Sequence, residues 1–384
     1  MEERFFTDPA EFTPLIDEIA TAASRPSRFR GLCGFDGFID RFVRMQSPPD
    51  MGAFGQLAKD SAGVSASAGV RVEGERFGGN GPLLVNALHG LFGGGIDLTY
   101  AGALGYPDVH PLFANALAHK VALKTLAAPA TSDCLEFTDG KIMLSDMTTC
   151  ADVHSLRLQE AFAPGELETL LSQADFVAAV NWGKLPALNS ILELLLERLA
   201  TGEAEQVPTK LFVDLAEFAH RSEEERRGLI ELIGKLATVT DLTLSLNLRE
   251  AWQLAATCGW DFSGQKEPAQ IVTAARFLFG QVSVGRLVIH PNNGAAMVST
   301  EGASWVTGPF CRAPLISTGA GDHFGAGVLA GQLLGLGDAA SLLLGNAASG
   351  YFVRSGHCPP VATLAEFLRN WARNILPERL PAAG

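Results

Sequence analysis

The chain has 384 residues, 47% of them hydrophobic, which is enough to bury a substantial core and favours one large enzyme domain over residues 1–384. Its formal net charge of −13 argues against binding to nucleic acid, because a phosphate backbone is usually met by a basic surface. The first eight residues are charged and lead into no long apolar stretch, so we expect no signal peptide, no membrane anchor and a cytoplasmic location.

Two acids stand at the end of an apparent first strand, within residues 34–42. Asp36 and Asp40 each carry a carboxylate, which can accept two hydrogen bonds from hydroxyl groups. Acids in a turn are also commonly solvated or capping residues.

A glycine loop precedes a probable helix at residues 78–82. Gly78 and Gly79 lack a Cβ, so the backbone beside Asn80 can approach a ligand closely. The same pattern also suits an ordinary structural turn.

Two regions interrupt the alternation of strands and helices, at residues 41–76 and 131–146. The second contains Asp139 followed by Gly140, which predicts a β-hairpin. An ordinary surface hairpin is the alternative to a functional insertion.

Short apolar runs then alternate with longer amphipathic segments. Strands are predicted at 176–180, 211–213, 242–246 and 287–289, and helices near 187–201, 222–236, 248–257 and 267–280. This βα order predicts an α/β fold with a doubly wound, mostly parallel sheet flanked by helices, whose ligands gather at the carboxyl ends of the strands. Asn181 and Asp214 stand at such ends and receive no assigned role.

The most informative segment is residues 316–327, where Asp322 directly follows a turn of small residues that opens a helix. The amides of Gly319, Ala320 and Gly321 can converge on an anion, which the helix N-terminus favours. A carboxylate beside an anion suits a base that takes a proton from an attacking hydroxyl, as in phosphoryl transfer. The alternative is an acid that only stabilises the helix N-terminus.

This segment resembles the C-terminal signature of the ribokinase-like, or PfkB, carbohydrate kinase family. The resemblance implies that Asp322 is the catalytic base and that Gly319, Ala320 and Gly321 form the anion hole. It implies that the glycine loop, Gly78 to Asn80, and either Asp36 or Asp40 bind the acceptor. It also implies a small β-sheet lid at residues 41–76 and 131–146. Ile316 stands where many members carry an Asp associated with a monovalent cation.

The resemblance extends to ATP and Mg²⁺. Asn247 and Glu250 match an N-x-x-E motif that the family uses around magnesium, with the glutamate acting through ordered water. The same spacing forms a simple helix cap, with Asn247 as the capping residue. Asn292, Gly294 and Asn346 are the nucleotide candidates that the family pattern implies.

These features predict an ATP-dependent kinase for a sugar or a sugar-like alcohol. The alternatives are a nucleoside kinase, and a regulator that binds sugar and nucleotide without turnover. The family pattern is also compatible with a homodimer.

Overall fold

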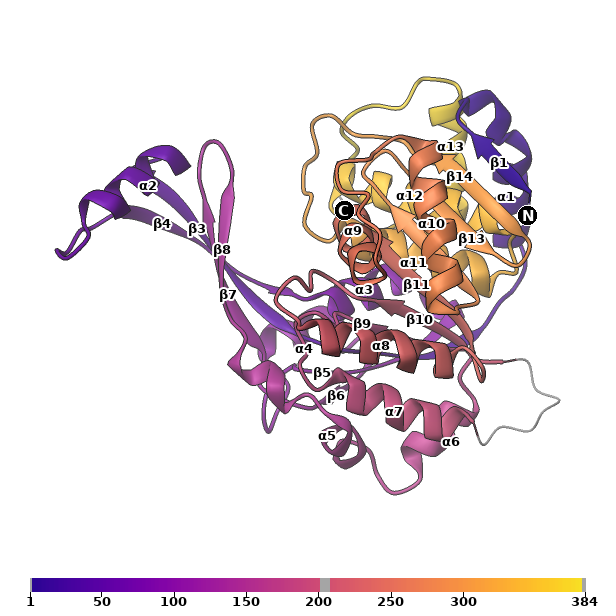
Figure 1. The fold of residues 1–384 in the computed structure, drawn as a ribbon, viewed down its shortest axis with the longest axis horizontal. Coiled ribbons are helices and arrows are strands. Elements are labelled where there is room, and N and C mark those ends of the chain that lie inside the picture. Colours follow the sequence, from indigo (N-terminus) through magenta and orange to yellow (C-terminus); the bar gives the residue numbers. More distant parts are fainter. Residues whose placement is uncertain (1, 201–207, 382–384) are drawn as a thin grey trace.

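A ten-stranded sheet forms the centre of the computed structural model, which describes residues 2–200 and 208–381 (Figure 1). Its strands lie in the order β1-β14-β13-β12-β11-β10-β9-β2-β5-β6. Among the described strands of this sheet, only β13 runs antiparallel to its neighbours. The strands are β1 (Glu3–Phe6), β2 (Phe29–Phe35), β5 (Ile96–Gly102), β6 (Ala122–Thr125), β9 (Phe176–Val180), β10 (Lys210–Asp214), β11 (Asp241–Asn247), β12 (Arg286–His290), β13 (Gly294–Ser299) and β14 (Gly302–Thr307).

The four predicted strands are confirmed as β9 to β12. Their apolar runs are covered on both faces, which is why they read as continuous hydrophobic segments. In register, Val180 lies beside Asp214, and Asn247 lies beside His290. Because these strands are parallel, their carboxyl ends bring polar residues to one edge of the sheet.

Helices cover both faces of this sheet, and each face has its own hydrophobic core. One face carries α5 (Ser155–Glu160), α6 (Glu166–Ser172), α7 (Leu188–Leu199), α8 (Glu223–Leu236), α9 (Leu248–Thr257) and α10 (Pro268–Val282). The other carries α1 (Thr13–Ala23), α3 (Asn80–Phe92), α4 (Pro111–Leu117), α11 (Ala320–Leu333), α12 (Asp338–Ser355) and α13 (Val361–Ala372). The predicted helices therefore correspond to α7 to α10, and the doubly wound fold is confirmed.

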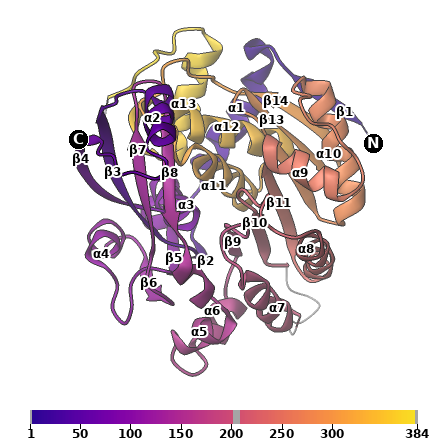
Figure 2. The same cartoon turned by 60° about the vertical axis from the view of Figure 1, so that its left-hand side comes forward.

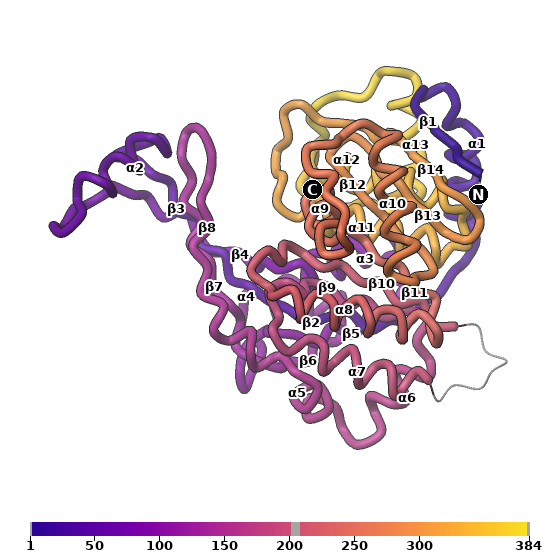
Figure 3. Tube along the Cα trace, in the orientation of Figure 1, coloured from indigo at the N-terminus to yellow at the C-terminus, as the bar shows by residue number. Residues whose placement is uncertain are grey.

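Helix α1, near the N-terminus, packs against helix α13, and the two lie side by side in Figure 3. Strand β1 pairs with β14 at the sheet edge, and the ring of Phe12 stacks on that of Trp371 with centroids 4.9 Å apart. No helix within residues 2–200 and 208–381 is long and apolar enough to cross a membrane.

A second, four-stranded sheet projects from this body (Figures 1 and 2). We call it the small sheet; its strands lie in the order β4 (Gly69–Gly78), β3 (Phe38–Ser47), β7 (Ala130–Glu136) and β8 (Lys141–Asp146), with α2 (Met51–Asp60) between β3 and β4. The predicted hairpin is confirmed, because β7 and β8 pair antiparallel around Asp139 and Gly140. Compared with the predicted segments, β3 begins three residues before 41 and β4 extends two residues beyond 76.

Candidate active site

Helix α11 begins with a sharp turn. Gly319 adopts φ 92°, a left-handed conformation that residues with a Cβ rarely take, and the helix starts at Ala320. Residues Ala320, Gly321 and Asp322 are the first three of the helix, whose amides have no acceptor within the helix. The Ala320 amide donates to the carbonyl of Ser317 at 3.2 Å. The remaining amides and the helix dipole favour an anion at this turn.

Asp322 lies on the first turn of α11, facing the start of α3. Asn80 Nδ2 donates to Asp322 Oδ1 at 2.8 Å. Burial raises the pKa of Asp322 well above its usual range, the negative charges of Asp214 and Asp36 raise it further, and the Asn80 hydrogen bond opposes the change. A carboxylate with a raised pKa is a better proton acceptor than an ordinary aspartate.

Asp36 is fully buried and serves as an acceptor for groups of the protein itself. Its Oδ2 accepts from the Asn80 amide at 2.8 Å and from Asn181 Nδ2 at 2.6 Å, and its Oδ1 accepts from the Gly81 amide at 2.8 Å. The Tyr100 hydroxyl donates to the Asp36 carbonyl at 2.6 Å. Asp36 therefore joins β2, the start of α3 and the end of β9, and its oxygens are already occupied.

Asp40 lies on β3 of the small sheet and faces a cavity. Burial raises its pKa to about 6, and the positive charge of Lys141 opposes that change. Gly78 has no room for a side chain, because a Cβ there would come within 2.3 Å of Asp40 Oδ2. A Cβ on Gly79 would likewise meet Asp36 Oδ2 at 2.9 Å. The two glycines let the loop pass close to both carboxylates.

A cavity of about 590 Å³, which we call the Asp40 cavity, lies between the small sheet and the large one. Asp40, Gly79, Asn80, Gly319 and Asp322 line it, so five of the predicted site residues meet there. Eight side chains of its described lining are polar, and Phe38 is the only aromatic one among them.

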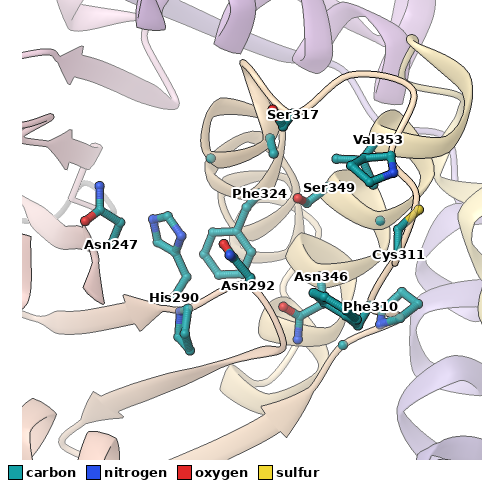
Figure 4. A pocket seen from close by; sticks show the side chains of 17 residues that line it. Asn247, His290, Asn292, Phe310, Cys311, Ser317, Phe324, Asn346, Ser349 and Val353 are labelled. Carbon is teal, nitrogen blue, oxygen red and sulfur yellow. The ribbon is translucent and has the colours of Figure 1, made fainter. Parts of the chain in front are cut away.

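A second cavity, of about 350 Å³, lies on the other side of the turn, and we call it the Asn346 cavity. Figure 4 shows Asn247 and His290, from neighbouring strands, on one side of it and Phe310 and Cys311 on the other. Asn346 lines it and donates from Nδ2 to the carbonyl of Val306 at 2.9 Å.

His290 stacks on Phe324 with ring centroids 4.5 Å apart, and burial lowers its pKa to about 4, so the imidazole is neutral. Its ring borders the Asn346 cavity. Asn292 borders the same cavity.

The turn that opens α11 separates the two cavities. Gly319 and Asp322 line the Asp40 cavity, whereas Ala320 and Gly321 line the Asn346 cavity. A group bound at this turn would therefore be within reach of ligands on both sides.

Asn247 and Glu250 are the residues that the sequence assigned to a magnesium site. Asn247 and Glu250 form a capping box at the start of α9, which is the capping alternative named for this motif. Burial raises the pKa of Glu250 well above its usual range, and the charge of Asp214 raises it further. Within residues 2–200 and 208–381, no group of three or more His, Cys, Asp or Glu side chains is placed to hold a metal ion. Asn247 lines the Asn346 cavity, whereas Glu250 is buried and lines neither of the two cavities.

Other residues lie in the Asp40 cavity that the sequence did not assign to a site. Asn181 and Lys184 follow β9, and Ser132 and Ser145 belong to the small sheet. The position of Asn181 at the end of a strand was the only available signal. Ser132 and Ser145 hydrogen bond each other at 2.8 Å across β7 and β8, a pairing that depends on the hairpin register.

Gly294, a predicted nucleotide residue, does not line the Asn346 cavity. It begins β13, where a Cβ would come within 2.7 Å of the Trp305 ring and of the Val306 carbonyl. The structure thus gives Gly294 a packing reason rather than a binding one.

Comparisons with known proteins identify the family. Residues 21–371 match the family model described as prokaryotic ketohexokinase. A ketohexokinase of Haloferax volcanii is 29% identical over 364 residues, which cover 90% of this chain and 92% of that protein.

The solved structures show the fold. A ribokinase of Arabidopsis thaliana complexed with ribose and ATP has a TM-score of 0.64 at 16% identity, covering 89% of this chain and 99% of that one. The ribokinase of Thermotoga maritima has a TM-score of 0.62 at 15% identity, covering 90% and 99%. The fold is ribokinase-like, as the sequence resemblance predicted.

Proposed function

Because the chain belongs to the prokaryotic ketohexokinase family, we propose that it transfers the γ-phosphoryl group of ATP to a hydroxyl of a ketohexose. The chain is a PfkB-type carbohydrate kinase, an enzyme that phosphorylates an alcohol group. The observation that carries the finer proposal is the α11 turn, which has one cavity on each side and Asp322 at its acceptor side. We place the sugar in the Asp40 cavity and the nucleotide in the Asn346 cavity.

The proposed reaction is a direct transfer. Asp322 takes the proton of the acceptor hydroxyl as that oxygen bonds to the γ-phosphorus, and the bond between this phosphorus and the oxygen bridging to the β-phosphate breaks. The electron pair of the broken bond leaves with ADP, and the proton stays on Asp322. The amides of Gly321 and its neighbours at the turn stabilise the negative charge on the group in transit.

The acceptor is held by polar side chains. Asp40 lines the cavity and Asp36 does not, so we assign sugar binding to Asp40 rather than to Asp36, whose oxygens are occupied. The Gly79–Asn80 segment completes the binding site. The abundance of polar side chains and the single aromatic ring favour a polyhydroxy acceptor over the flat base of a nucleoside.

The nucleotide would contact Asn292 and Asn346. Mg²⁺ would be held through water by Asn247 and Glu250, with Asp214 nearby, and would supply positive charge to the nucleotide phosphates. The small sheet would act as a lid that excludes water from the sugar.

The test is to incubate the protein with Mg²⁺, ATP and a panel of ketoses, aldoses and nucleosides, and to detect phosphorylated products by mass. A phosphorylated ketohexose as the preferred product supports the proposal. A phosphorylated nucleoside as the preferred product would replace it with a nucleoside kinase. Binding of sugar and nucleotide without product would replace it with a regulator.

A further inference from the structure

We propose that Lys141 of the small sheet is a catalytic residue that contacts the phosphoryl group during transfer. This inference rests on the proposed kinase function and adds a residue to it. Lys141 is the first residue of β8, directly after the hairpin turn at Gly140. Its ammonium donates a hydrogen bond to Oγ1 of Thr318, although the two residues are 177 positions apart.

The contact places the lysine beside the α11 turn. Thr318 immediately precedes Gly319, and consecutive Cα atoms lie about 3.8 Å apart. Thr318 lines the Asp40 cavity and also a third cavity of about 810 Å³, which Lys141 lines from the small sheet. The lysine side chain is flexible, so its ammonium can exchange a hydroxyl partner for a phosphoryl oxygen at the turn. The charge of Lys141 also acts on Asp40, the proposed sugar-binding residue, because it lowers the pKa of Asp40 against the effect of burial.

Among the described residues that line the Asp40 and Asn346 cavities, no other cation lacks an ion-pair partner. None of the described residues that line the Asn346 cavity is a lysine or an arginine. In the Asp40 cavity, Lys184 pairs with Glu217 at 3.3 Å.

The other cations of the third cavity are also engaged. Arg44 pairs with Glu73 at 2.7 Å and with Glu136 at 2.8 Å, and the Arg76 guanidinium lies 5.0 Å from the centroid of the Phe42 ring. The Lys141 ammonium, by contrast, has a neutral hydroxyl as its partner.

The chemistry needs such a charge. Asp322, Asp214 and Glu250 already carry or develop negative charge around the turn, and a triphosphate adds more. During transfer, negative charge moves from the phosphoryl group onto the oxygen that leaves with ADP, while the acceptor proton moves to Asp322. An ammonium that arrives with the small sheet stabilises this arrangement most when the sheet has closed over the sugar.

The experiment compares K141M, K141R and the control K59M with the wild-type protein, using ATP, Mg²⁺ and D-fructose. Lys59 is an exposed lysine of α2, at the outer end of the small sheet in Figure 1, so K59M removes a lid charge far from the turn. Losing one preorganised donor to the transferred group predicts that K141M lowers kcat by on the order of 100- to 1000-fold, with smaller changes in both KM values. K141R should retain more activity than K141M, and K59M should match the wild type. Thermal unfolding of each variant checks that the fold is kept.

A second readout separates contact with the phosphoryl group from a merely structural tie to Thr318. ADP with aluminium fluoride and fructose mimics the group in transit, and a catalytic contact predicts that K141M binds this mixture much more weakly while its affinity for ADP alone is unchanged. Equal weakening of both, or a K141M variant as active as K59M, would overturn the role of Lys141. Failure of the wild-type protein to phosphorylate any sugar would instead contradict the proposed function, on which that role depends.

Discussion

Asn80 Nδ2 donates a 2.8 Å hydrogen bond to Oδ1 of Asp322, and this bond ties the start of α3 to the start of α11. It favours the charged form of the carboxylate, in opposition to burial. The protonation of the proposed base therefore depends on a residue of the glycine loop.

The first prediction concerns this bond. N80A removes the donor and should raise the pKa of Asp322 further, so the fall of kcat/KM toward acidic pH should begin at a higher pH than in the wild type. The measurement is kcat/KM against pH. N86A is the matched control, because Asn86 lies on the same helix and bonds Lys120 instead. An acidic limb that stays in place in N80A would contradict the link.

The second prediction concerns removal of the proposed base, which should lower activity but raise thermal stability. D322N should lower kcat by about 100- to 10,000-fold, the usual contribution of a general base, while ATP binding persists. Because the folded-state pKa of Asp322 is raised, its charge costs stability at neutral pH, so D322N should also raise the melting temperature. Kinetics, ATP calorimetry and thermal unfolding test these points. A D322N variant that keeps wild-type kcat would exclude Asp322 as the base.

The two neighbouring aspartates should separate by their effects. D40A should raise KM for the sugar by roughly 10- to 100-fold, because it removes a charged hydrogen-bond acceptor from the cavity. D36A leaves three donors, the amides of Asn80 and Gly81 and the side-chain amide of Asn181, without their acceptor and should lower the free energy of unfolding by at least about 1–3 kcal/mol. Steady-state kinetics and urea unfolding distinguish them. The assignment fails if D36A folds as stably as the wild type and loses only sugar affinity.

The pKa of Asp40 predicts a pH-dependent stability of the ligand-free protein. Its value of about 6 in the folded protein exceeds the unfolded value of about 3.9, so the folded state binds more protons between these pH values. The contribution of Asp40 to stability is therefore fully present below about pH 4 and is lost as the pH rises through 6. D40N lacks this titration, and its stability relative to the wild type should increase over that interval by on the order of 1–3 kcal/mol. Urea unfolding of both proteins at pH 4.5, 5.5 and 7 tests it; a constant difference would contradict it.

Strands β9 to β12 of the large sheet could be predicted from the sequence because they are short apolar runs, buried on both faces and separated by amphipathic helices. The α11 turn could be predicted because three small residues and an aspartate are consecutive in the sequence. Both signals are local, and local patterns survive without knowledge of the fold.

The rest depends on contacts between distant segments. Whether Asp36 or Asp40 faces the cavity is decided by donors from α3 and β9, up to 145 residues away. Asn181 contacts Asp36 from a left-handed backbone conformation, φ 65°, which the neighbouring sequence does not predict. Ser132 and Ser145 line the Asp40 cavity, and Lys141 lines the third cavity, only because the small sheet borders both. Strand β8 is mostly exposed, so its sequence resembles that of an ordinary surface hairpin.

The position of the α11 turn between the two cavities also determines which kinetic mechanism the enzyme can follow. Sugar and nucleotide would bind in separate cavities on opposite sides of this turn, so neither has to dissociate before the other can bind. In the proposed transfer Asp322 takes a proton and not the phosphoryl group, so the group passes directly from nucleotide to sugar. Turnover then requires a ternary complex, and double-reciprocal plots at several fixed sugar concentrations would intersect rather than run parallel.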